Sequence, residues 1–183
     1  MVSNRANCKA VSFAKKNNID VYIVEETKPA LSNDEIDLLN VLIEYKADLL
    51  VLAGYLKLIS IPIIDCYQNK ILNIHPSLLP KYGGKGYYGQ RVHRAVLNSG
   101  EKESGITIHL VNEKYDEGFV LFQKKIFIDR INETSDLSAK ILELEHFYYS
   151  KVIALFCLNK IRWKNNKPQL IEEKDFEYEV CNN

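Results

Sequence analysis

The sequence has no glycine in its first 53 residues, because all eight glycines of the 183-residue chain come later. Phosphate-binding loops of the GxGxxG and P-loop kinds need closely spaced glycines, so none is available in this region. The chain opens on Met1-Val2-Ser3, which we interpret as the end of a strand. A doubly wound nucleotide-binding sheet opens on a strand, a glycine-rich turn and a helix. We therefore expect the first strand and helix of such a sheet to be missing.

An excess of one charge, metal-binding cysteine pairs and long apolar runs are absent as well. Lys+Arg and Asp+Glu number 24 each, which gives no electrostatic basis for binding nucleic acid or an anionic membrane. The four cysteines, at positions 8, 66, 157 and 181, have no zinc-ligand spacing, and we expect free thiols and no metal site. No apolar run reaches the roughly 20 residues of a membrane-spanning helix, and the N-terminus does not resemble a signal peptide. We expect a soluble, cytoplasmic protein.

The first half of the chain alternates between strand and helix patterns. Short runs that are apolar on both faces, typical of buried parallel strands, occupy residues 21–24, 49–53 and 70–74. Helical patterns occupy residues 6–17, 33–46 and 62–67. This alternation predicts an α/β fold with a mostly parallel, Rossmann-like sheet and helices on both faces.

The second half has a different pattern. It contains a predicted helix over residues 88–98, two β-rich runs at 105–111 and 119–128, and a long amphipathic helix over 135–157. A polar loop joins the two β-rich runs, which suggests a hairpin-like pair added to the sheet. A second, terminal hairpin is expected around Asn165-Asn166. We predict a catalytic domain over residues 1–158 and a C-terminal hairpin or tail over residues 159–183.

Two polar side chains, Asn73 and His75, lie two residues apart at the end of a predicted buried strand. The two-residue period of a strand puts both on the same side of the backbone, and ligands bind at the carboxyl ends of strands in open α/β sheets. An Asn amide can donate to an oxygen that gains negative charge, and a His can exchange a proton near neutral pH. An isolated pair of this kind more often satisfies local backbone groups. The pair alone therefore leaves both interpretations open.

The octapeptide NIHPSLLP at residues 73–80 closely resembles the signature of the formyltetrahydrofolate-dependent formyltransferases. The segments LAGYL at 52–56, GITIH at 105–109 and YDEG at 115–118 follow in the order of that family. The octapeptide looks most like that of the phosphoribosylglycinamide (glycinamide ribonucleotide) formyltransferases. The resemblance implies the formyltransferase fold, 10-formyltetrahydrofolate as formyl-donor cosubstrate and no metal. It implies formyl transfer to the amine of glycinamide ribonucleotide in de novo purine biosynthesis.

The resemblance also implies a catalytic trio. Asn73 is expected to hold the formyl oxygen, and His75 to donate a proton or stabilise the tetrahedral oxyanion. Asp116 is expected to pair with His75 and raise its pKa, or to relay a proton through water from the attacking amine. His109 is interpreted as a structural core residue. His93 is interpreted either as a helix-surface residue or as a residue that lies behind those that contact substrate.

Further residues correspond to substrate-binding positions of the family. Leu56, Lys57, Leu58 and Ile59, with Asn73, match the residues that border the folate. Glu145 matches the acid that contacts glycinamide ribonucleotide, although a solvated helix carboxylate is an equally good interpretation of this residue alone.

The chain also departs from the family pattern. The N-terminal strand and the loop that binds the ribonucleotide phosphate are expected to be missing. The glycine-rich segment at residues 83–89 is longer than usual, and its Lys85 could approach a phosphate. Alternatives are a related formyltransferase acting on a sugar-nucleotide amine, or an inactive truncated remnant that only binds folate or a protein. We expect small-molecule substrates and either a monomer or a homodimer.

Overall fold

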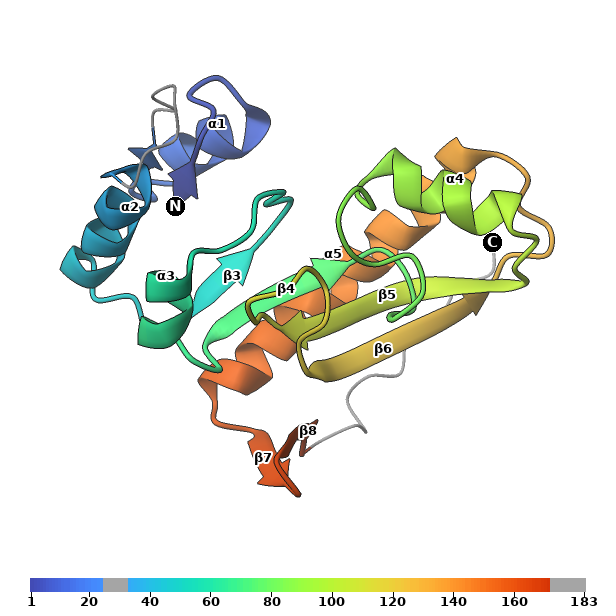
Figure 1. Ribbon diagram of the computed structural model, residues 1–183. Coiled ribbons are helices and arrows are strands. Elements are labelled where there is room, and N and C mark those ends of the chain that lie inside the picture. The colour runs from blue at the N-terminus through green and yellow to red at the C-terminus, as the bar shows by residue number, and fades with distance from the viewer. Residues whose placement is uncertain (25–32, 172–183) are drawn as a thin grey trace. The chain divides into compact units, whose positions relative to one another are not determined.

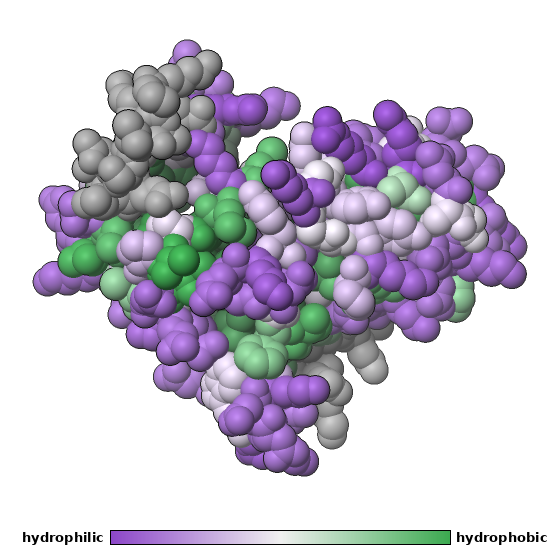
Figure 2. Space-filling model, in the orientation of Figure 1, coloured by the Kyte–Doolittle hydropathy of each residue, from purple (hydrophilic) through white to green (hydrophobic). Residues whose placement is uncertain are grey.

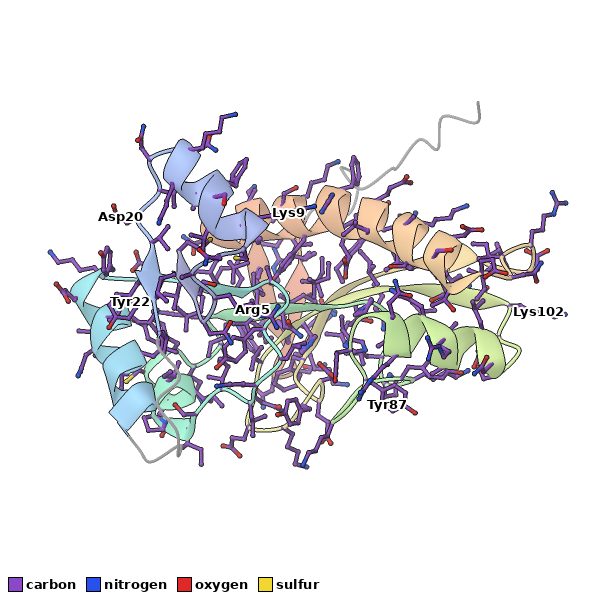
Figure 3. All side chains as sticks on the ribbon, turned by 90° about the horizontal axis from the view of Figure 1, so that it is seen from above. Arg5, Lys9, Asp20, Tyr22, Tyr87 and Lys102 are labelled. Carbon is purple, nitrogen blue, oxygen red and sulfur yellow. The ribbon has the colours of Figure 1, made fainter. Side chains whose placement is uncertain are left out.

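The computed structural model describes residues 1–24 and 33–171, which form parts of two compact units, Met1–Ala47 and Asp48–Asn183. In the first unit, strands β1 (Val2–Ser3) and β2 (Tyr22–Ile23) pair in parallel. Helix α1 (Lys9–Lys16) connects them, and helix α2 (Asn33–Glu44) follows. In Figure 3, Lys9 and Asp20 lie toward opposite ends of α1, and Tyr22 lies on β2. The helices predicted at 6–17 and 33–46 are thus confirmed with shorter bounds.

The second unit is built on a four-stranded sheet (Figure 1). The strand order is β3 (Leu50–Leu52), β4 (Ile71–His75), β5 (Glu103–Leu110) and β6 (Val120–Phe127). β3 and β4 are parallel, whereas β5 is antiparallel to both of its neighbours. The α/β class and the hairpin-like pair are confirmed. The sheet is mixed because β5 runs opposite to β4 and the short loop from β5 can only return the chain antiparallel.

Three helices accompany this sheet: α3 (Ile61–Cys66), α4 (Gln90–Asn98) and α5 (Thr134–Cys157). Figures 1 and 3 show α5 lying along one face of the sheet, and α4 packs against α5. The side chains of α5 that are buried follow one another at intervals of three or four residues, which places them on one stripe of the helix. They are Leu137, Ile141, Leu144, Tyr148 and Val152, and Tyr149, directly after Tyr148, is buried as well. This stripe and the inner residues of β4 and β5 form the hydrophobic core.

The chain turns after α5 into a hairpin of β7 (Ile161–Lys164) and β8 (Lys167–Leu170). Its two connecting residues, Asn165 and Asn166, have φ angles of 51° and 58°. Asparagine tolerates this left-handed conformation, and two such residues make the tight turn that suits a hairpin. The predicted terminal hairpin is confirmed, while residues 172–183 of the predicted tail lie outside the described residues.

The cysteine prediction is confirmed in part. Cys8, Cys66 and Cys157 are free thiols, and Cys181 lies outside the described residues. In the portion of the chain that the structure describes, no helix is long and apolar enough to cross a membrane.

Candidate active site

The site begins with two paired strands in the middle of the sheet. Asn73 and His75 lie on the same side of β4, as their spacing predicts. The β4–β5 register places His109 opposite Asn73, and Thr107 opposite His75. Directly opposed residues of an antiparallel pair share one face, so the register adds His109 and Thr107 to the two predicted polar residues.

The third predicted residue, Asp116, comes from the loop between β5 and β6. Its Oδ2 lies 3.5 Å from His75 Nδ1, and its Oδ1 lies 3.6 Å from His109 Nε2. The loop is tight because a Cβ on Gly118 would lie 1.7 Å from the carbonyl oxygen of Leu110, a contact that only glycine avoids. The structure therefore brings Asn73, His75 and Asp116 together and places Asp116 between two imidazoles.

The ring of His75 is 4% exposed and has a defined orientation. Its Nε2 lies 2.7 Å from the carbonyl oxygen of Tyr82, and because a carbonyl only accepts, Nε2 carries the proton. Burial lowers the pKa of His75 below its ordinary value, although Asp116 and the Tyr82 carbonyl both act to raise it. Asp116 thus acts on the pKa in the expected direction, but desolvation of the imidazolium outweighs the nearby carboxylate and the net shift is downward. His75 is neutral at pH 7, and its Nδ1 is a proton acceptor.

For Asp116, the neighbouring groups outweigh burial in setting the pKa, which is the reverse of the balance at His75. Burial opposes its ionisation, but the His109 side chain, the His75 ring and the Gly84 N–H outweigh burial and lower its pKa. The Gly84 N–H donates to Asp116 Oδ2 at 2.8 Å. Hydrogen bonds to a charged group favour its charged form, so Asp116 is a carboxylate at neutral pH.

His109 has a larger role than the structural one expected from its strand. It is buried, as expected of a core residue, and its Nδ1–H donates to the Leu110 carbonyl at 2.9 Å. Its Nε2 lies 3.1 Å from the Asn73 amide nitrogen, and because an amide nitrogen only donates, Nε2 accepts this hydrogen bond. His109 therefore sets the orientation of the Asn73 amide. The alternating pattern of the GITIH segment predicted the strand that carries His109. Nothing in the sequence near His109 indicated that Asn73 would be its partner.

These residues border a cavity of about 880 Å³ that lies entirely in the second unit. Asn73, His75 and Asp116 line it, together with Leu56 and Glu145. The glycine-rich segment at residues 84–89, including Lys85, lines it as well. Figure 2 shows hydrophobic (green) and near-white residues beside hydrophilic (purple) ones on this face of the molecule. Figure 3 shows Tyr87 near the start of α4.

The remaining predicted folate contacts are placed differently. Lys57 and Leu58 are exposed, Ile59 is buried, and none of the three is among the cavity-lining residues. Their contact with folate stays a prediction. His93, in contrast, is buried at 4% exposure and lines the cavity. Of its two interpretations, the helix-surface position is therefore wrong, and a place beside the residues that contact substrate stays open. The reason is that α4 turns this face toward the protein, with Val92 and Val96.

Glu145 extends from α5 into the cavity lining, and burial raises its pKa to about 7. A carboxyl group with this pKa is partly protonated at neutral pH, so it can take up or release a proton as a ligand binds. Among the described residues there is no group of three or more His, Cys, Asp or Glu side chains that could hold a metal ion.

Comparison with known proteins places this geometry in a family. The family described as "Formyl transferase" matches residues 1–153, a range that includes every residue of the site. This chain belongs to the formyl transferase family. Its curated relatives include a chloroplastic phosphoribosylglycinamide formyltransferase of Arabidopsis thaliana, 39% identical over 176 residues, with 95% of this chain and 60% of that protein covered. The chain thus spans less than two thirds of that relative's length.

Other formyl transferases match over more of their length. The phosphoribosylglycinamide formyltransferase of Haemophilus influenzae is 33% identical over 168 residues, covering 91% of this chain and 76% of that protein. The crystal structure of glycinamide ribonucleotide transformylase 1 from Symbiobacterium toebii superposes with a TM-score of 0.84 at 30% identity, covering 93% of this chain and 79% of that one. The predicted formyltransferase fold is thereby confirmed.

Proposed function

We propose that this chain transfers a formyl group from 10-formyltetrahydrofolate to the amine of glycinamide ribonucleotide, a reaction of purine biosynthesis. The observation that carries the proposal is the convergence of Asn73, His75 and Asp116 on one cavity in a member of the formyl transferase family. The names of the Arabidopsis and Haemophilus relatives support glycinamide ribonucleotide as the acceptor. The cavity volume of about 880 Å³ lies in the range of small-molecule binding sites.

Asn73 is the proposed donor to the developing oxyanion. Its amide nitrogen carries two hydrogens, and His109 accepts one of them. The second is directed by the same planar group and can donate to the formyl oxygen. Because His109 holds the amide before the reaction, little reorganisation is needed as the oxygen becomes negative.

His75 is the proposed carrier of the proton. The amine nitrogen attacks the formyl carbon, a C–N bond forms, and the carbonyl electron pair moves to oxygen. His75 Nδ1 accepts the proton that the amine loses, and Asp116 Oδ2, 3.5 Å away, stabilises the resulting imidazolium. As the tetrahedral intermediate collapses, the bond to the folate nitrogen breaks and His75 returns the proton to that nitrogen.

Two sides of the cavity are proposed to hold the substrates. Residues 56–59 are the proposed border of the folate ring, and Leu56 is the member of this segment that lines the cavity. Glu145 is the proposed contact for the amine of the acceptor, since a half-buried carboxyl group gains from pairing with a positive or hydrogen-donating partner.

The test is a formyl-transfer assay on the full chain with 10-formyltetrahydrofolate and glycinamide ribonucleotide. We expect turnover, and a fall in kcat of about 100-fold or more for Asn73→Ala and for His75→Ala. Lys102→Ala is the control, because Lys102 is exposed and lies beyond the far end of α4 in Figure 3. Transfer to an amino-sugar nucleotide but not to glycinamide ribonucleotide would replace the proposed acceptor. Folate binding without turnover on either acceptor would contradict the proposed activity.

A further inference from the structure

The segment after β4 contacts His75 and Asp116, the two titratable members of the catalytic trio, through its backbone. The Tyr82 carbonyl accepts from His75 Nε2 at 2.7 Å, and the Gly84 N–H donates to Asp116 Oδ2 at 2.8 Å. The first contact decides which ring nitrogen of His75 carries the proton. With Nε2–H engaged, Nδ1 is the acceptor that faces Asp116.

This carbonyl is held in place by the side chain of the same residue. Tyr82 has a φ angle of 56°, a left-handed conformation that bulky residues rarely adopt without further support. Its hydroxyl lies within hydrogen-bond distance of Ser99 Oγ and lies 3.2 Å from Glu101 Oε1. The Ser99 hydroxyl in turn donates to the Val96 carbonyl at 2.7 Å, so the hydroxyl of Tyr82 is anchored to the last turn of α4.

The surroundings of Tyr82 support the same assignment. Its ring lies 6.2 Å from the ring of Tyr87 in an edge-to-face arrangement, which restricts rotation of the side chain. Lys81 Nζ pairs with the same Glu101 oxygen at 2.7 Å, which holds that carboxylate beside the Tyr82 hydroxyl. The residue thus links the end of α4 to the imidazole of His75.

We propose that Tyr82 is a positioning residue: its anchored hydroxyl holds its carbonyl against His75 Nε2, and this contact selects the tautomer whose Nδ1 exchanges the proton. A glutamine or aliphatic residue at this position would offer the same carbonyl without the anchor. The kinetic consequence rests on the proposed function, whereas the tautomer does not depend on it.

Tyr82→Phe tests the anchor, since it keeps the ring and removes only the hydroxyl. Tyr45→Phe is the matched control, because Tyr45 is 57% exposed and lies in the first unit. Nitrogen NMR of the histidine rings in the wild-type chain should show His75 protonated at Nε2 and not at Nδ1. In Tyr82→Phe the two signals should move toward each other as the tautomers mix, and kcat should fall about 10-fold with KM for either substrate changed less than about 2-fold.

The acid limb of the pH profile of kcat provides a second test of the proposal. The Tyr82 carbonyl favours the protonated ring, so its displacement should move the acid limb to lower pH, a change that general loosening of the fold does not predict. Ser99→Ala removes the Ser99 hydroxyl that contacts the Tyr82 hydroxyl. It should produce the same changes in tautomer, kcat and pH profile at smaller size, and it replaces Tyr82→Phe as the test if that variant does not fold.

Three outcomes would overturn the inference. A wild-type His75 protonated at Nδ1, an unchanged tautomer in both variants, or an unchanged kcat and pH profile in both variants would each do so. A wild-type chain without formyl transfer would instead contradict the proposed function, and the NMR measurement would still decide the tautomer.

Discussion

The raised pKa of Glu145 makes the stability of the fold depend on pH in a defined direction. This carboxyl lies on α5, is half-buried, and has a pKa of about 7 because burial disfavours its charge. In the unfolded chain its pKa is the ordinary value of 4.5. Folding is therefore penalised at every pH at which the carboxyl of the unfolded chain is ionised.

The sign follows from the two pKa values. Below 4.5 both states bind the proton and Glu145 causes no penalty. As the pH rises from 4.5 through about 7 the unfolded chain releases its proton first, and the stability that the neutral carboxyl allows is progressively lost. Above about 7 both states are ionised and the penalty is constant. Allowing for partial solvent screening, its size is roughly 1–3 kcal/mol.

Glu145→Gln removes this titration while keeping the size of the side chain. We expect urea unfolding to give nearly equal stabilities for the variant and the wild type at about pH 4, and a variant that is more stable by roughly 1–3 kcal/mol at about pH 8. Glu143→Gln, at an exposed position of the same helix, is the control and should differ little from the wild type at either pH. A difference between Glu145→Gln and the wild type that is the same at both pH values would refute the reasoning.

Three further predictions concern the surroundings of His75. Asp116→Asn keeps the shape but removes the charge that stabilises the imidazolium, so kcat in the formyl-transfer assay should fall about 100-fold; an unchanged kcat would exclude that role. Gly83→Ala would place a Cβ 2.5 Å from Leu79 Cδ2 and 3.1 Å from Asp116 Cβ. Because this contact would displace Asp116, we expect about 10-fold lower formyl-transfer activity. Full activity would show that the segment around Gly83 moves freely. The Thr107 hydroxyl accepts a hydrogen bond from the Leu79 N–H and donates one to the Ser77 carbonyl. Thr107→Val should therefore lower the free energy of unfolding by about 2–4 kcal/mol, and Thr107→Ser, which keeps the hydroxyl, by about 1 kcal/mol or less. Equal losses for the two variants in urea unfolding would contradict this.

Most elements of the fold were predictable because their signals are local. The stripe of α5 and the apolar runs of β3 and β4 lie within a few residues, and their predicted bounds differ from the observed ones by only a few residues. The direction of β5 relative to β4 was less accessible, because a pattern of alternating side chains does not say which strand becomes the neighbour.

In the candidate site, too, some features follow from local sequence and others only from the tertiary structure. That Asn73 and His75 share a face follows from the two-residue period of a strand, and family resemblance indicated Asp116 as their partner. The structure added the Tyr82 carbonyl and the orienting role of His109. It also showed that burial, which opposes the effect of Asp116, sets the net direction of the shift in the pKa of His75.

The sequence by itself therefore determined most of the secondary structure, the shared face of Asn73 and His75, and the resemblance to a formyltransferase. Only the tertiary structure decided that His109 contacts the Asn73 amide, that the Tyr82 carbonyl faces His75 Nε2, and that burial outweighs Asp116 in shifting the pKa of His75. The physical reason is that strand register and desolvation depend on residues distant in the chain. Side-chain periodicity depends only on neighbours.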